Sequence, residues 1–163
     1  MNRAPPVTAG SSPPSRRLGY AWLALTLTLA LHVADEAAHD FLSVYNPSVA
    51  AIRQRLPFLP LPTFTFPVWL TGLSLAVLGL LVLSPLAFRN NRWAVRLSYP
   101  FAGLMFANGL GHLGGSLYLG NLMPGVWSSP LLLLASGCLF LNARRTTKGN
   151  PPEAPGAVRS PRA

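Results

Sequence analysis

The sequence predicts an all-α protein: a bundle of four transmembrane helices with disordered, proline-rich tails. Half of its 163 residues are hydrophobic and only 10% are charged, whereas an average soluble domain carries about 25% charged residues. So few charges cannot coat the surface of a soluble protein of this size. The single cysteine permits neither an intrachain disulfide nor a zinc site built on cysteines. The composition therefore excludes a coiled coil, a disordered chain and an ordinary soluble enzyme.

Long uncharged runs mark the expected spans, because a helix needs about 20 apolar residues to cross the bilayer core. Such runs extend over residues 18–34, 56–88 and 97–143. The last run is long enough to cross twice, and its segment GNLMPG at residues 120–125 is a strong turn signal. The four predicted spans are about 18–43, 67–88, 97–119 and 127–143.

The first run is longer than the roughly 7–15 apolar residues of a signal peptide, and no clear Ala-x-Ala cleavage site ends it. We therefore predict a retained helix rather than a removed leader. Both ends of the chain are rich in proline and hold too few apolar residues to order themselves. The predicted domains are a disordered tail at 1–17, the four-helix transmembrane domain at 18–143 and a basic, proline-rich disordered tail at 144–163.

The segment between the first two predicted spans, residues 46–67, is dense in proline. Prolines at this density prevent a helix, because each removes a backbone N–H and clashes with the preceding turn. We predict a plain connector at the outer membrane interface. A segment that folds back over the bundle and caps a site is the alternative.

Basic residues indicate the orientation. All of them except Arg53 and Arg55 fall in the N-terminal segment, in the loop after the second span or in the C-terminal tail. The positive-inside rule therefore predicts that both termini are cytoplasmic. The net charge of +9 then reflects contact with anionic lipid head groups. Nucleic acid is not an expected partner, since the charges are scattered over helix ends.

Lys148 is the only lysine beside many arginines. This preference is typical of GC-rich bacterial genomes, so the expected location is the bacterial inner membrane.

Ionisable residues gather in the outer half of the first predicted span. Asp35, Glu36 and Asp40 lie there, together with His32 and His39. Each ionisable group costs at least ~2.5–3.5 kcal/mol at the centre of a span, so such groups are rare and usually functional. At about 100° per residue, His32, Glu36 and His39 share one narrow helical stripe. The pattern predicts a polar site on the first span.

The remaining histidine, His112, lies in the third predicted span, with Asn108 one turn before it and Ser116 one turn after it. His32 and His112 lie at equal depth on parallel helices, because both follow the cytoplasmic end of their span by a similar number of residues. A stripe of small residues runs beside His112: Gly103, Ala107, Gly111 and Gly115. Small residues at this spacing let another helix approach closely. We therefore expect the first and third spans to touch, with His32 near His112.

Such a cluster suits a metal, since imidazole and carboxylate are ligands of zinc and iron. The candidate ligands of a single ion are His32, Glu36, His39 and His112. Four protein ligands would close a tetrahedral site, and three would leave the open position that catalysis requires. A di-iron centre needs more carboxylates than this chain supplies.

Without a metal, Glu36 and His32 would act as a catalytic acid and base that moves a proton on an apolar small molecule. Asp35, Asn108 and Ser116 would support the site. The leading function is an intramembrane polar site that binds or acts on an apolar small molecule, with membrane lipid as the surrounding partner. The alternative is a non-enzymatic membrane helper or transporter-like subunit, in which the cluster fastens helices or relays protons.

The residues of this cluster also resemble a known family. Residues 32–36, HVADE, resemble the motif of the HXXEE family of small bacterial membrane proteins, with Asp35 in place of the first Glu. Asn108 and His112 resemble the family's Asn-x-x-x-His element. Residues 122–128, LMPGVWS, resemble its later Pro-Gly-x-x-Thr turn, with serine for threonine and Met for the usual Tyr. The resemblance covers roughly residues 20–135 and implies an integral membrane protein whose histidine and acids matter, without implying a reaction.

Overall fold

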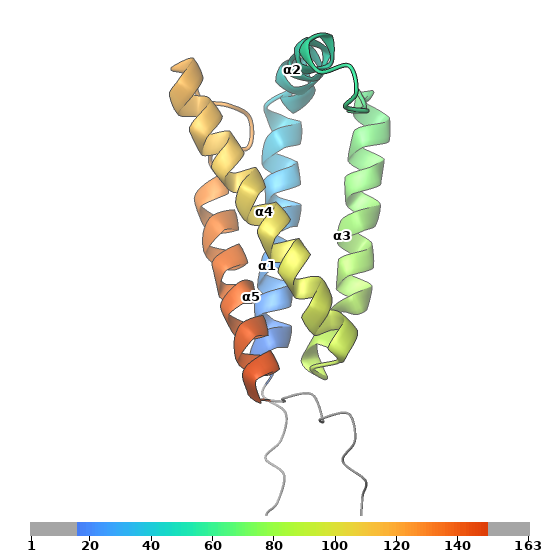
Figure 1. Cartoon of the computed structure of the whole chain (residues 1–163), viewed down its shortest axis with the longest axis vertical. Coiled ribbons are helices and arrows are strands. Elements are labelled where there is room, and N and C mark those ends of the chain that lie inside the picture. Colours follow the sequence, from blue (N-terminus) through green and yellow to red (C-terminus); the bar gives the residue numbers. More distant parts are fainter. Residues whose placement is uncertain (1–15, 150–163) are drawn as a thin grey trace, which may run out of the picture.

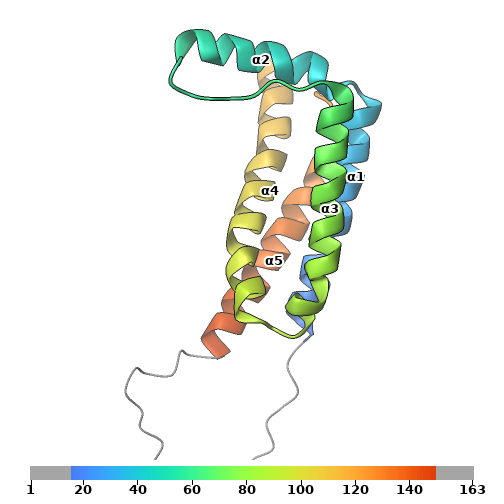
Figure 2. The same ribbon diagram turned by 90° about the vertical axis from the view of Figure 1, so that its right-hand side faces the viewer.

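The computed structural model describes residues 16–149, and within this range the chain is all α-helical. The helices are α1 (Arg17–Ala38), α2 (Phe41–Arg55), α3 (Phe66–Phe88), α4 (Arg92–Leu119) and α5 (Ser129–Gly149). Four of them run along the length of the bundle, and α2 lies across one end (Figures 1 and 2). The all-α prediction is confirmed. The tails predicted to be disordered fall, for residues 1–15 and 150–163, outside the described residues.

Two of the described helices, α1 and α3, are long and apolar enough to cross a membrane. The predicted bundle of four such spans is not confirmed, because α4 and α5 do not meet the same criterion. Glycine, serine, asparagine and histidine dilute the apolar residues of α4, and the end of α5 is polar and basic. The limits of α3 agree with the sequence prediction. The predicted break at 120–125 is also present, since α4 ends at Leu119 and Gly120 caps it in the left-handed backbone conformation.

The core lies where α1 meets its neighbours. α1 packs along α3 on one side and along α5 on the other, and α4 packs mainly along α5. Trp22 of α1 is buried among Leu132 and Leu139 of α5, and its Nε1–H donates to the Leu80 carbonyl of α3 at 3.0 Å. α3 and α4 contact each other little, and Figure 1 shows them separating towards α2. Residues of both helices line a cavity.

The first predicted span is shorter than expected. α1 ends at Ala38 rather than at residue 43, and Asp40 adopts a left-handed conformation with φ 52°. Asp and Asn tolerate this conformation better than most residues. The chain turns there and enters α2, so the two helices lie at a steep angle to each other (Figure 2).

The expectation that residues 46–67 contain no helix is wrong for their first part. α2 continues through Pro47 to Arg55, because a single proline removes only one helical hydrogen bond. Residues 56–65 are non-helical, as predicted. Asn46 joins this connector to α2 through two hydrogen bonds. Its Nδ2–H donates to the Phe64 carbonyl at 2.9 Å, and its Oδ1 accepts from the Phe64 N–H at 3.1 Å.

Two further expectations differ from the structure. α5 continues to Gly149, past the predicted helix end at residue 143, and Tyr99 of α4 shares a hydrogen bond of 3.1 Å with Thr147 in this extension. No other helix packs closely against the small-residue stripe on α4 at Gly103 or Gly111, because Cβ atoms added there would meet nothing within 4 Å. α1 and α4 therefore meet through polar side chains rather than through close backbone packing.

Gly19 tests the packing of α1 against α3. A Cβ atom there would clash with the Phe88 ring and lie 2.8 Å from the Phe88 Cα. We expect Gly19→Ala to destabilise the protein by about 1–3 kcal/mol through overpacking, measured as thermal unfolding in detergent. Gly79→Ala is the control, since its Cβ would meet nothing within 4 Å, and alanine should stabilise that helix by up to about 1 kcal/mol. Equal effects of the two substitutions would contradict the packing described.

Candidate functional site

Three of the predicted site residues meet at the interface of α1 and α4. His32, Glu36 and His112 are 0%, 4% and 4% exposed. Glu36 Oε1 lies 3.1 Å from His112 Nε2 and 3.6 Å from His32 Nε2. The two imidazole rings stand edge to face, with centroids 4.8 Å apart. The predicted proximity of His32 and His112 is confirmed, and one carboxylate oxygen lies close to the Nε2 atoms of both rings. We call these three residues the His–Glu–His cluster.

Ser128 and Asp35 orient the His32 ring through a chain of hydrogen bonds. The Ser128 N–H and O–H both donate to Asp35 Oδ2, at 2.9 and 2.7 Å, and Ser128 Oγ lies 2.8 Å from His32 Nδ1. The Gly125 carbonyl is a longer alternative acceptor for the hydroxyl, at 3.2 Å, and a hydrogen bond to a carboxylate is the stronger of the two. Since the only hydroxyl proton is given to Asp35, Ser128 Oγ accepts from His32 Nδ1–H.

This hydrogen bonding sets the tautomer of His32. With the proton on Nδ1, the lone pair of Nε2 points into the cluster. The Asn108 Nδ2–H donates to that nitrogen at 3.0 Å, as the same tautomer requires. His32 is thus presented as a neutral imidazole with its basic nitrogen beside Glu36.

The turn between α4 and α5 closes over the cluster at Gly125. Its φ of 84° lies in the left-handed region, where glycine is favoured. A Cβ atom there would lie 2.9 Å from His112 Cε1 and 3.0 Å from Glu36 Cγ. Both reasons require glycine at this position. The Pro-Gly-x-x-Ser segment therefore supplies a close backbone approach to the cluster at Gly125 and the hydroxyl that orients His32 at Ser128.

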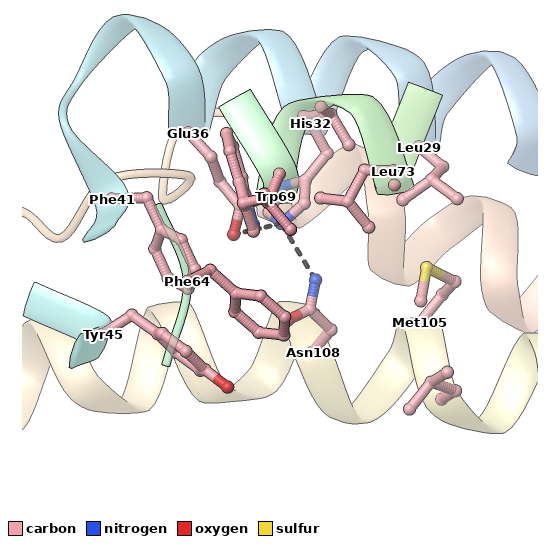
Figure 3. Close-up of a pocket in the computed structure, with 14 residues that line it drawn as sticks. Leu29, His32, Glu36, Phe41, Tyr45, Phe64, Trp69, Leu73, Met105 and Asn108 are labelled. Carbon is pink, nitrogen blue, oxygen red and sulfur yellow. Dashed lines mark hydrogen bonds and ion pairs between the residues drawn. The ribbon is translucent and has the colours of Figure 1, made fainter. Parts of the chain in front are cut away.

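A cavity of about 380 Å³ adjoins the cluster (Figure 3). His32, Glu36 and Asn108 form its polar wall. The other walls are apolar or aromatic and come from all four of the helices α1 to α4 and from the connector; the labelled aromatic residues among them are Phe41, Tyr45, Phe64 and Trp69. His112 stands behind this wall and contacts the Phe41 ring, with centroids 5.6 Å apart.

The aromatic wall was not predicted, because its residues carry no polar signal. The connector before α3 was expected to be a plain link, yet Phe64 lines the cavity. The alternative, in which this segment caps a site, is the better description.

Two predicted residues lie apart from the cluster. His39 is not brought to Glu36: its Nδ1 lies 2.8 Å from the Asp35 carbonyl and 3.0 Å from Asp35 Oδ1, and its side chain is largely exposed. The physical reason is the end of α1 at Ala38, since the stripe shared with Glu36 required a continuing helix. Ser116 donates to the His112 carbonyl at 2.7 Å and accepts from the Met123 N–H at 2.9 Å. It ties the turn to α4.

A family model described as "Protein of unknown function with HXXEE motif" matches residues 22–140. No curated protein and no solved structure matches the chain. The match includes every residue of the cluster and the turn that covers it. In this chain the two acids of the motif have different contacts: Asp35 binds Ser128, and Glu36 faces His112.

Ser128→Ala tests the orientation of His32. The substitution leaves His32 Nδ1 without a partner and removes the hydroxyl donor of Asp35, which keeps the backbone N–H of residue 128. An unsatisfied buried polar group costs about 1–3 kcal/mol. We expect a loss of that size in unfolding measurements, and recovery in Ser128→Thr. Ser136→Ala is the matched control, because that buried hydroxyl only donates to the Leu132 carbonyl of its own helix at 2.7 Å. An equal loss in the control would show that the Ser128 contacts add no stability of their own.

Proposed function

The chain belongs to the HXXEE family, and we propose that it is an integral membrane protein whose His–Glu–His cluster binds or acts on an apolar small molecule. One observation carries this proposal: a buried carboxylate and imidazole form the polar wall of an otherwise apolar cavity. Pockets of this kind, with a few polar groups in apolar surroundings, are the usual sites of small-molecule recognition.

The apolar surface of the bundle supports the membrane location. α3 buries only Trp69 and Ala87 of its 23 residues. Its exposed residues include Leu75, Leu78 and Val82, and an apolar face of this kind is typical of surfaces that a membrane or a partner covers. A bilayer would cover it. The proposal places α1, α3, α4 and α5 across the bacterial inner membrane, with α2 at the outer interface.

The distribution of basic residues supports both termini being cytoplasmic. The beginning of α1, the loop between α3 and α4 and the end of α5 lie at the same end of the bundle (Figure 1). That end holds all the basic residues of the described chain except Arg53 and Arg55, which lie on α2 at the opposite end. This asymmetry is the positive-inside pattern.

The cavity selects a ligand with an apolar body and one polar group, since only one of its walls is polar. Its rim residues Val68 and Leu104 are 61% and 65% exposed, and they belong to α3 and α4, the helices that separate (Figure 1). The proposed ligand enters sideways from the bilayer between them. Without a bound metal ion, His32 Nε2 would act as a base there, and Glu36 would stabilise the resulting imidazolium.

A structural role of the polar residues, as in a membrane helper or transporter-like subunit, is favoured by the contact of Asp35 with Ser128, because it fastens α1 to the start of α5. That role accounts for Asp35. It does not account for Glu36 and His32, which face the cavity.

Gly72 lines the cavity, and a Cβ added there would meet nothing within 4 Å. A phenylalanine at this position starts from an unobstructed Cβ, and its ring would occupy part of the cavity. We expect a photoreactive diazirine-bearing long-chain alcohol to label Phe64 and Met105 saturably in the purified protein, and Gly72→Phe to reduce this labelling severalfold. Gly79→Phe, which places the same ring on the same helix away from the cavity, should label like the unchanged protein. Labelling that does not saturate, or that responds equally to both substitutions, would contradict the proposal.

Reporter fusions test the orientation. A reporter attached after Gly149 should be active in the cytoplasm, and one inserted at Gln54 of α2 should be active outside, because the basic residues are distributed unequally. A C-terminal reporter found outside would exclude the proposed topology.

A further inference from the structure

We propose that His32, Glu36 and His112 bind one divalent transition-metal ion, either zinc or ferrous iron, with an open coordination position towards the cavity. The ligand atoms of these three residues all lie within 4.8 Å of one another. Two imidazoles and one carboxylate form a ligand set used by catalytic zinc and by non-haem iron. The inference rests on the geometry of the cluster and does not require the proposed small molecule.

The two distances that separate Glu36 from the histidines fit such an ion. Metal–ligand bonds of about 2.1 Å place ligand atoms about 3.4 Å apart in a tetrahedral site and about 3.0 Å apart in an octahedral one. The separations of Glu36 Oε1 from His112 Nε2 and His32 Nε2 are 3.1 and 3.6 Å. The nitrogens of the two imidazoles lie within 4.8 Å of each other, and the rings would move closer together to surround an ion.

The surroundings of His32 are those of a metal ligand. Histidines that bind metals donate their other ring N–H to a carboxylate, a carbonyl or water, which fixes the tautomer. Here the His32 Nδ1–H is held by Ser128, which is itself held by Asp35. The Nε2 lone pair is thereby directed at the cluster before any ion arrives. Ser128 and Asp35 are positioning residues for this site.

The other two polar contacts of the cluster can adapt to an ion. Asn108 Nδ2 contacts the same His32 Nε2 lone pair, and a half-turn of its amide would present Oδ1 instead. His112 Nδ1 is buried without a hydrogen-bond partner in the described part of the chain, while its Nε2 lies 3.1 Å from Glu36 Oε1. The ring can move its proton from Nε2 to the unpartnered Nδ1, and the Nε2 lone pair is then available to the metal.

Three protein ligands leave a position for a fourth group. His39, the only other histidine, is held by Asp35 and cannot close the site. The polar wall formed by His32 and Glu36 faces the cavity, so the open position faces the proposed ligand. An ion there would polarise the polar group of a bound molecule.

The test uses the full chain, purified in detergent with a tag that contains no histidine and stripped of metal with a chelator. Titration with Co²⁺ reports coordination through the visible absorption of the bound ion. The protein is also loaded with Zn²⁺, or with Fe²⁺ under argon. Gel filtration followed by elemental analysis then gives the stoichiometry of each ion. We expect one ion per chain. His32→Gln, Glu36→Gln and His112→Gln should each abolish stoichiometric binding.

His39→Gln and Asp40→Asn are the matched controls and should retain one ion, because neither side chain reaches the cluster. Ser128→Ala should keep the stoichiometry and weaken the affinity by about 10–100-fold, and Ser128→Thr should restore it. Should a cluster variant fail to fold, as judged by circular dichroism and gel filtration, this Ser128 pair still decides the question. Failure of the unchanged protein to retain any of the three ions, or equal loss in His39→Gln, would overturn the proposal. The photolabelling result at Gly72 would be unaffected by that failure.

Discussion

The carboxylate of Glu36 imposes the constraint on which the arrangement of the helices depends. A buried carboxylate is costly unless donors or cations face it, and in this structure His112 Nε2 on α4 is the group that can donate to it, at 3.1 Å from Oε1. If the bundle lies in lipid, apolar packing alone discriminates weakly between arrangements, because lipid is as apolar as leucine. The polar contacts then determine the position of α4 relative to α1.

The same constraint explains why the turn before α5 is built as it is. Gly125 lies against both Glu36 and His112, where any side chain would collide. Ser128 follows it and joins Asp35 to His32. The two neighbouring acids of α1 thus have different roles. Asp35 binds the turn and, through Ser128, sets the tautomer of His32. Glu36 faces the cavity and His112. An aspartate in the first acidic position of the motif makes these contacts with Ser128.

Part of this arrangement was predictable from the sequence. The limits of α3 follow from an uncharged run bounded by Pro67 and Arg89, and the meeting of His32 with His112 follows from equal depth on parallel helices. The end of α1 was not predictable, because nothing in the apolar pattern marks Asp40 as a left-handed residue. That single turn removes His39 from the cluster.

The aromatic wall was missed for a different reason. Its residues come from α2, α3 and the connector between them, and apolar residues in such a chain predict burial or lipid contact equally well. Which of them surround a cavity depends on the separation of α3 from α4, a tertiary property. Polar residues were easier to predict as a site, since their cost in an apolar environment requires a partner.

The central claim is that one carboxylate oxygen of Glu36 lies close to the Nε2 atoms of two imidazole rings, and solid-state NMR of the protein in bilayers tests it most directly. Glu36 and Glu153 are the only glutamates, and the chain has three histidines. A Glu153→Gln, His39→Gln variant with ¹³C-glutamate and ¹⁵N-histidine therefore isolates the three residues. The account predicts dipolar dephasing of the Glu36 carboxyl carbon by ring nitrogens of both His32 and His112, as the separations of 3.6 and 3.1 Å from Oε1 require. A carboxyl signal that neither histidine dephases would contradict it.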